Sequence, residues 1–171
     1  MKRRLVVVGS CLRGNGYPNA TGTLSALAST GRWEICDRAH WLPEDLHLWR
    51  IARGPKIRLL LFLLWLLFRS GFSLLDAIRR YGRESLYYAP YPSLFVLLWA
   101  SLLPSWWRPK IVSDAYISIW DSMFVDRGTG KPSLTARFAR CVEKRALQTA
   151  SAVLVDTEVN RSWVIEKFRT E

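Results

Sequence analysis

Short apolar runs alternate with longer helical patterns along the chain, and this alternation is the feature that most restricts its fold. The first run, Leu5–Val8, is rich in β-branched residues and ends at a glycine, which is typical of a central parallel strand covered on both faces. Strands that alternate with helices in this way are joined by right-handed crossovers. The sequence therefore predicts an α/β fold with a doubly wound parallel sheet. The expected strands are Leu5–Val8, Trp33–Asp37, Ser85–Ala89, Lys110–Ser113 and Ala152–Asp156, and the expected helices are Thr21–Thr30, one that opens at Pro43–Asp45, Pro92–Leu103, Leu134–Thr149 and Val159–Phe168.

The composition narrows the class of protein further. The 171 residues suit a single domain, 1–171, and a chain that is 50% apolar and 13% aromatic is not a disordered one. The formal net charge of +11 predicts a surface that attracts polyanions. Because basic residues stand beside apolar runs, as in Trp106–Arg108, an anionic membrane surface is favoured over nucleic acid as a partner. Three cysteines without a CxxC motif favour a cytoplasmic location.

One segment, residues 56–81, is unusually dense in Leu, Phe and Trp. Its longest charge-free run, Leu59–Phe68, has only ten residues, whereas a membrane-spanning helix needs about 20. On a helix, four of its charged residues fall within about 40° of each other and leave a broad apolar surface. The segment is therefore predicted to lie flat as an amphipathic helix at the inner face of the cell membrane. The charged stripe is Arg58, Arg69, Asp76 and Arg80, and the expected membrane-surface residues are Lys56, Arg58, Trp65 and Arg69.

Two other interpretations of residues 56–81 stay open. A core helix of an α/β domain can be apolar nearly all round, and a spanning helix is conceivable although Gly71 and the charges interrupt it. The interfacial helix is favoured because the segment carries more Leu, Phe and Trp than one stripe packed on a sheet requires.

A glycine-containing loop follows the first expected strand. Glycines here let the backbone approach a ligand, and a helix amino terminus favours phosphate. A dinucleotide-binding fingerprint would need a third glycine where Asn19 stands, although Asp37 lies about where a ribose-binding acid belongs. A phosphate site, a redox cofactor site and an ordinary strand-to-helix turn all remain open. The loop candidates are Gly14, Asn15, Gly16 and Tyr17.

Polar residues also follow the third and fourth expected strands, at the sheet edge where open α/β sheets bind ligands. The carboxylate of Asp114 can act as a base, accept a hydrogen bond from a substrate hydroxyl, or merely cap a helix. His40 and His47 have no partner motif, so no metal site is predicted. The candidates for holding an acceptor are Tyr91, Ser93, Tyr116 and Ser118.

Several of these segments resemble a known family. Residues 112–127, VSDAYISIWDSMFVDR, precede a basic helix and then residues 150–157, ASAVLVDT, with Asn160 beyond them. Together with the GNGYP loop and the YAPYPS turn, these motifs resemble family 4 glycosyltransferases of the GT-B fold. The similarity runs from Arg4 to about Phe168 and depends on the order and spacing of the motifs. It implies that the Rossmann-like sheet is the amino-terminal half of a GT-B fold.

The resemblance also implies an activity. Such enzymes transfer a sugar, with retention and without a metal or further cofactor, from a nucleotide-sugar donor to a sugar or lipid-linked acceptor, often at the cytoplasmic membrane face. Their amino-terminal domain holds the acceptor, its glycine loop approaches the donor diphosphate, and a carboxyl-terminal domain binds the nucleotide. Gly14 and Gly16 match that loop, and Asp114 matches a residue that contacts the transferred sugar, which makes it the catalytic candidate.

The donor-binding domain of that family has no counterpart in these 171 residues. The chain is therefore expected to be the acceptor-binding half and to be inactive alone. The alternatives are a noncatalytic subunit whose partner chain supplies the donor domain, and a Rossmann-type redox protein.

Overall fold

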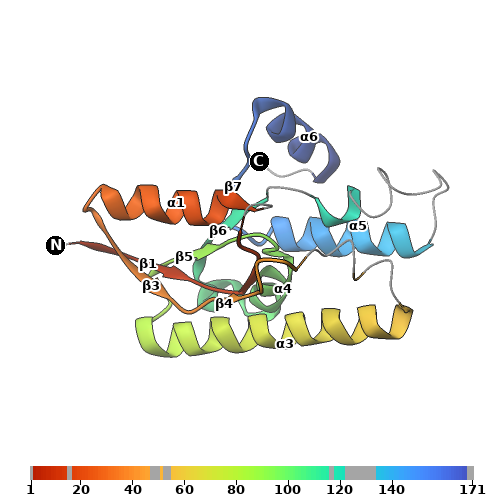
Figure 1. The fold of residues 1–171 in the computed structure, drawn as a ribbon, viewed down its shortest axis with the longest axis horizontal. Coiled ribbons are helices and arrows are strands. Elements are labelled where there is room, and N and C mark those ends of the chain that lie inside the picture. Colours follow the sequence, from red (N-terminus) through yellow and green to blue (C-terminus); the bar gives the residue numbers. More distant parts are fainter. Residues whose placement is uncertain are drawn as a thin grey trace.

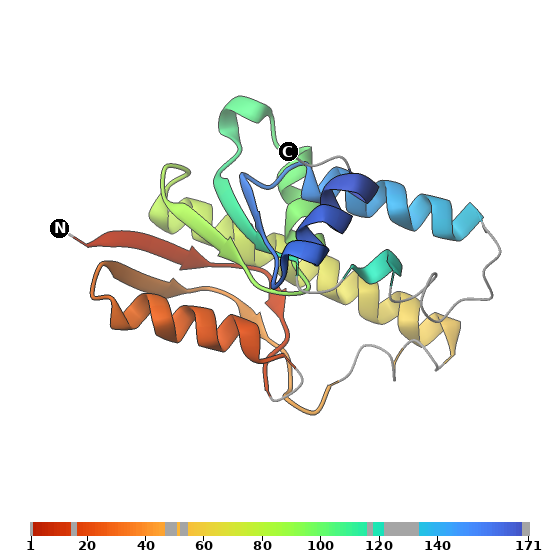
Figure 2. The ribbon, with the colours of Figure 1, turned by 90° about the horizontal axis from the view of Figure 1, so that it is seen from above.

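The computed structural model describes residues 2–14, 17–46, 51, 55–115, 118–121 and 134–168. Its main sheet has five strands in the order β3-β1-β5-β6-β7, and every pair in it is parallel. The arrowheads of the strands point to the same side in Figure 2. The α/β class and all five expected strands are thus confirmed, and the arrangement is compatible with a Rossmann-like fold. The strands are β1 (Arg3–Val7), β3 (Trp33–Asp37), β5 (Leu86–Ala89), β6 (Lys110–Asp114) and β7 (Ala152–Leu154).

Helices cover both faces of the sheet, as the doubly wound topology requires (Figure 1). Leu5, Val7 and Tyr88 face one way and pack beneath the helix that joins β1 to β3. Val6, Val8 and their neighbours face the other way, toward the helices that follow β3 and β5. The helices are α1 (Pro18–Ser29), α3 (Lys56–Tyr81), α4 (Leu94–Leu102), α5 (Leu134–Leu147) and α6 (Glu158–Phe168), and a short 3-10 turn, η1, spans Ser105–Trp107.

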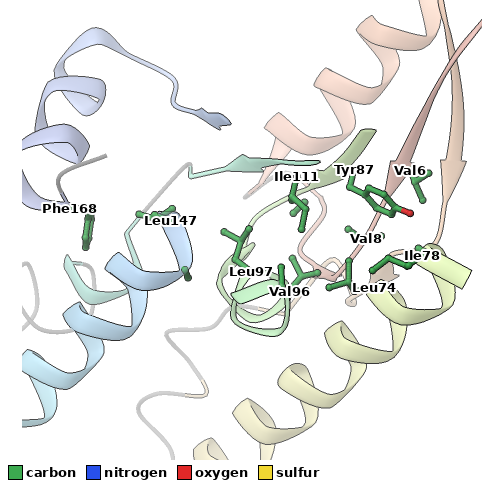
Figure 3. Close-up of a cluster of buried hydrophobic side chains, with 14 of the residues drawn as sticks. Val6, Val8, Leu74, Ile78, Tyr87, Val96, Leu97, Ile111, Leu147 and Phe168 are labelled. Carbon is green, nitrogen blue, oxygen red and sulfur yellow. The ribbon is translucent and has the colours of Figure 1, made fainter. Parts of the chain in front are cut away.

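The largest core cluster lies between the sheet and α3, α4 and α5 (Figure 3). It depends on alternation along the strands, because successive side chains of a strand point to opposite faces. It extends past the sheet to Phe168 at the end of α6, whose ring stands edge-on to those of Trp120 and Trp163. The side chains labelled in Figure 3 are Val6, Val8, Leu74, Ile78, Tyr87, Val96, Leu97, Ile111, Leu147 and Phe168.

A second, two-stranded parallel sheet pairs β2 (Ser10–Cys11) with β4 (His40–Trp41) and was not expected from the sequence. It continues the β1–β3 ladder past a bend at Gly9, whose φ of 103° suits glycine. The amide of His40 donates to the carbonyl of Gly9 over 2.7 Å, which bridges the bend. The β1–β3 pair therefore reaches further toward the carboxyl edge of the sheet than the apolar run alone indicates.

Some expected boundaries are wrong by a few residues. Helix α1 begins at Pro18 rather than Thr21, because proline suits the first helical turn, where its missing N–H leaves no hydrogen bond unmade. The segment expected to open a helix at Pro43–Asp45 contains a turn at residues 44–45, and residues 47–50 beyond it lie outside the described residues. Strand β7 ends at Leu154 rather than Asp156.

Helix α3 is neither fully buried nor free of the core. Leu66, Leu74 and their neighbours on one face are buried, and this face packs chiefly on α4. The opposite face exposes large apolar side chains. The core-helix interpretation therefore holds for one face only. By length and composition alone, α3 is also the sort of helix that can cross a bilayer.

Gly71 allows a close contact between α3 and α4. A Cβ at Gly71 would lie 2.5 Å from Cε2 of Trp99, whose ring is held by an Nε1 hydrogen bond of 2.8 Å to the carbonyl of Leu67. Overpacking of this kind costs about 1–3 kcal/mol, more than the gain of about 1 kcal/mol from replacing a helical glycine. Gly71→Ala is expected to lower the free energy of unfolding, measured with urea.

Gly22 on α1 is the matched control, because a Cβ there meets no atom within 4 Å. Gly22→Ala is expected to raise the free energy of unfolding by about 0.5–1 kcal/mol. Equal effects of the two substitutions would contradict the close contact between α3 and α4.

Candidate functional site

The strand order places a topological switch point between β1 and β5. The chain leaves β1 through α1 toward β3 on one side, and it leaves β5 through α4 toward β6 on the other. Two adjacent parallel strands whose connections diverge leave a crevice at their carboxyl ends, and open α/β sheets bind ligands there. The loops after β1 and β5 and the end of β6 therefore form the candidate site.

The loops after β1 and β5 are joined directly. The amide of Leu12 donates a 2.9 Å hydrogen bond to the carbonyl of Tyr91. The rings of Tyr17 and Tyr91 stack with their centroids 5.6 Å apart and their planes 15° from parallel. A cis peptide bond joins Tyr91 to Pro92. Tyr17 and Tyr91, both predicted as site residues, thus form one aromatic wall.

Asp114 is the last residue of β6 and only 6% of its surface is exposed. The hydroxyl of Tyr88, in β5, donates to its Oδ2 over 3.1 Å. Burial, and then the charge of Asp114, raise the pKa of Tyr88 well above its ordinary value, so the phenol keeps its proton and remains a donor. Asp114 is therefore held in a fixed place by a neighbouring strand.

Ser118, rather than Asp114, occupies the cap position of the short turn at residues 119–121. The hydroxyl oxygen of Ser118 accepts a 3.1 Å hydrogen bond from the amide of Asp121, and it donates to Oε2 of Glu143 over 3.0 Å. Ser118 was predicted to face an acceptor, but these bonds give its hydroxyl a structural role. Tyr116 lies outside the described residues.

Ser93 links the end of β5 to the end of β6. Its hydroxyl lies 2.7 Å from that of Ser113 and donates to the main-chain carbonyl of Asp114 over 3.3 Å. Both serines are buried, so the pair fixes the spacing of the two strand ends. Ser93 was predicted from the sequence, whereas Ser113 and Tyr88 were missed because both lie within strands.

Two shallow pockets meet at Tyr91 and Asp114. Each has room for about one water molecule, so a larger ligand would lie across their mouths. No Lys or Arg appears among the described residues that line them. The lining residues of the first pocket are Tyr91, Pro92, Ser93, Leu94, Asp114, Ala115, Ile119, Glu143, Ala146 and Leu147, and those of the second are Leu12, Tyr17, Asn19, Ala20, Tyr91 and Asp114.

Glu143 on α5 is a buried carboxylate in this site that the sequence analysis missed. It accepts hydrogen bonds from the amides of Ile119 and Trp120 over 2.9 and 2.8 Å. Burial raises its pKa, although these hydrogen bonds work in the opposite direction. A glutamate on the same helical stripe as the apolar Ala146 and Leu147 is the signal that could have revealed it.

The raised pKa of Glu143 predicts how the free energy of unfolding depends on pH. The folded protein keeps this proton at pH values where the unfolded chain, with a pKa near 4.5, has lost it. The contribution of Glu143 is therefore greatest below pH 4.5 and decreases as the pH rises through the folded pKa. Glu143→Gln is expected to remove this decrease from the free energy of unfolding, measured with urea across the acid range.

Glu166 serves as the control, because it is exposed and Lys167 lowers its pKa. Glu166→Gln should leave the decrease in place. An unchanged pH profile in Glu143→Gln would show that Glu143 does not titrate in this way.

The glycine loop is described only in part. Gly14 has a φ of 98°, and a Cβ there would lie 3.1 Å from the Cβ of Glu44, so backbone conformation and packing both favour glycine at this position. Asn15 and Gly16 lie outside the described residues. Tyr17 precedes α1 without a side-chain hydrogen bond to cap the helix, and the first turn of α1 carries no acidic residue. This helix end is electrostatically compatible with an anion.

Asp37, the last residue of β3, bonds to the turn that follows it. Oδ1 of Asp37 accepts from the amide of Ala39 over 3.0 Å, and Oδ2 accepts from Nε1 of Trp41 over 2.7 Å. Both oxygens of the candidate ribose-binding acid are thus engaged in the turn between β3 and β4.

The predicted membrane-surface residues all lie on α3 and not among the residues that line the two pockets. Lys56, Arg58 and Arg69 are exposed, and the guanidinium of Arg69 lies over the ring of Trp65, 5.8 Å from its centroid. The ring of Trp65 also meets His40 edge-on at 5.1 Å. Within the described part of the chain, no three His, Cys, Asp or Glu side chains gather where they could hold a metal ion.

The chain matches no protein-family model, and no curated protein matches its sequence. The geometry of the carboxyl edge is therefore the main guide to function. The likeness to family 4 glycosyltransferases depends on the motifs in the sequence itself.

Proposed function

We propose that this chain is the acceptor-binding half of a glycosyltransferase that uses a nucleotide-sugar donor. The observation that carries the proposal is the placement of Asp114, a buried carboxylate at the carboxyl edge that both pockets share. It stands beside the switch point, where this class of sheet binds ligands. In the family that the sequence resembles, the residue at the matching position contacts the transferred sugar.

The chemistry of the edge suits a sugar hydroxyl better than a diphosphate. A carboxylate accepts hydrogen bonds from hydroxyl groups, and an aromatic wall such as Tyr91 with Tyr17 offers an apolar face to a sugar ring. A diphosphate needs positive charge, and the described residues that line the pockets supply none. We therefore assign the acceptor to this edge and the nucleotide contacts to a second domain.

That second domain is either carried on the same polypeptide or supplied by a partner chain. With it in place, an acceptor oxygen bonds to the anomeric carbon on the face from which the diphosphate leaves, the bond from that carbon to the diphosphate oxygen breaks, and the hydroxyl proton passes to Asp114 or to the leaving diphosphate. Asp114 orients the sugar hydroxyl and can take part in this proton transfer. The resemblance implies retention at the anomeric carbon and neither a metal nor a further cofactor.

The test is a transfer assay on the completed enzyme, meaning this chain together with its donor-binding domain. A panel of radiolabelled nucleotide sugars is offered with free sugars and lipid-linked sugars as acceptors. Transfer from one donor to one acceptor class is the expected result. Hydrolysis of the nucleotide sugar without transfer to any acceptor would contradict the proposal. Reduction of a nicotinamide or flavin cofactor without any sugar transfer would contradict it as well.

A further inference from the structure

Helix α3 has three different faces. One is buried in the core, a second carries the stripe of Arg58, Arg69, Asp76 and Arg80, and the third is apolar and exposed. The side chains of this exposed set leave between 39% and 71% of their surface open. Monomeric proteins in water rarely expose a continuous apolar patch of more than a few hundred Å², and larger ones mark binding surfaces. The exposed apolar face consists of Ile57, Leu60, Leu61, Leu64, Trp65, Phe68, Phe72 and Leu75.

Positive charge adjoins this apolar face. Helix α3 has five basic residues and one acidic residue, Asp76, which is paired with Arg80 over 2.8 Å. Lys56, Arg58 and Arg69 are exposed beside the amino-terminal part of the face. Apolar side chains flanked by Arg and Lys are the pattern that binds the headgroup region of anionic lipid.

We infer that the exposed apolar face of α3 docks flat on an anionic lipid bilayer. The helix cannot leave the fold to span that bilayer, because its opposite face is tied to the core. The hydroxyl of Ser70 accepts a 3.1 Å hydrogen bond from the amide of Ser10, and the carbonyl of Leu67 accepts from Trp99. Spanning would break these contacts and expose the core.

A second copy of the chain is a poorer partner for this face. In a symmetric dimer each surface patch meets its own copy. The basic side chains beside the face, Arg58 and Arg69 among them, would then be brought to one interface from both copies, and an excess of like charge at an interface is unfavourable. Anionic headgroups instead complement them. The charge therefore selects lipid over self-association.

Docking through α3 also sets the distance between the candidate site and the bilayer surface. Leu66, on the buried face of α3, lies in the same apolar cluster as Leu12 and Tyr91 of the carboxyl edge. The site is therefore separated from the exposed face by about one helix diameter, roughly 10 Å. An acceptor anchored in the same bilayer would reach the site with a short polar head. The docking itself does not depend on sugar transfer.

The test is co-sedimentation of the full chain with vesicles of phosphatidylcholine alone and of phosphatidylcholine with phosphatidylglycerol. Binding is expected only to the anionic vesicles, and it should weaken as salt is raised. Replacement of Leu60, Leu64 and Phe68 by Gln should reduce partitioning on the order of 100-fold, because each loses apolar contact with the acyl boundary. These side chains are exposed, so the melting temperature should stay near that of the parent.

A matched control removes exposed apolar surface elsewhere. Leu134, Phe138 and Val159 are 83%, 71% and 78% exposed but lie on α5 and α6. Their replacement by Gln should leave vesicle binding unchanged. Replacement of Arg58 and Arg69 by Gln should weaken binding to anionic vesicles while the apolar face stays intact.

Fluorescence of the parent protein gives a measurement that does not require either triple variant. Brominated lipids should quench Trp65 in bound parent protein, and the quenching should be smaller in Trp65→Phe. Absence of binding to anionic vesicles would overturn the inference. Equal loss of vesicle binding in the α3 triple variant and in the control triple variant would also overturn it. So would a parent protein that binds no vesicles but forms a dimer, if the Leu60, Leu64 and Phe68 substitutions dissociate that dimer.

Discussion

Without a donor-binding domain, this chain is expected to transfer sugar about 10⁴-fold more slowly than the completed enzyme, or not measurably. In a two-domain transferase the reacting atoms meet in the cleft between the domains, so the isolated half lacks nearly all contacts with the nucleotide. The described residues that line the larger pocket also supply no positive charge to stabilise a leaving diphosphate, and they include the carboxylates of Asp114 and Glu143. The measurement is initial rate with a labelled nucleotide sugar.

The control for this comparison is the donor-binding domain alone, which should bind the nucleotide sugar but transfer nothing. Addition of this chain in trans should restore some transfer if the two halves associate. Rapid turnover by the isolated chain would contradict the idea that it is one half of an enzyme.

Asp114→Asn in the completed enzyme is expected to lower the rate of transfer by about 10² or more while the melting temperature changes little. An asparagine side-chain oxygen can still accept the hydrogen bond from Tyr88, so the strand ends should keep their spacing. It cannot accept a proton from a sugar hydroxyl. The combination of a lost rate and a kept fold is what distinguishes a catalytic carboxylate from a structural one.

Tyr88→Phe is the companion variant, because it removes the donor to Asp114 but leaves the carboxylate in place. A smaller decrease in kcat than in Asp114→Asn is expected, since Tyr88 acts only by positioning Asp114. Full activity in Asp114→Asn would remove Asp114 from the proposed chemistry.

The strand pattern of the main sheet could be predicted because it depends on local signals. Runs such as Leu5–Val8 combine β-branched composition with turn residues at their ends, and these signals are sufficient for a buried parallel strand. Strand β2 and strand β4 escaped prediction because each has only two residues and forms by continuing an existing ladder past Gly9. No local pattern encodes such a pairing.

The candidate site shows the same division. Tyr91, Ser93 and Asp114 could be placed from the rule that ligands bind at the carboxyl ends of strands. Glu143 could not, because it comes from a helix some 30 residues later and reaches the site only through packing of α5 on α4. Ser118 stood at a suitable position in the chain, but its hydroxyl bonds to Glu143.

Helix α3 was predicted as a helix with a charged stripe, and the structure confirms its bounds of Lys56–Tyr81. Periodicity alone could not divide its apolar surface into a buried and an exposed part. That division depends on Gly71, which lets Trp99 approach one side of the helix. It also depends on Ser70 and Ser73, whose hydroxyl oxygens accept hydrogen bonds from the backbone amides of the bend between β1 and β2. Tertiary contacts thus decide which apolar side chains of α3 remain exposed.

The most direct test of the acceptor-site assignment is a ¹H–¹⁵N correlation spectrum of this chain titrated separately with acceptor sugars and with nucleotide sugars. Acceptor sugars are expected to shift amide signals at the carboxyl edge, around Tyr91, Ser93 and Asp114, and Tyr91→Ala should weaken that response. Nucleotide sugars should bind the isolated chain weakly or not at all. Tight nucleotide binding by this chain, or sugar-induced shifts confined to parts of the molecule away from this edge, would contradict the account.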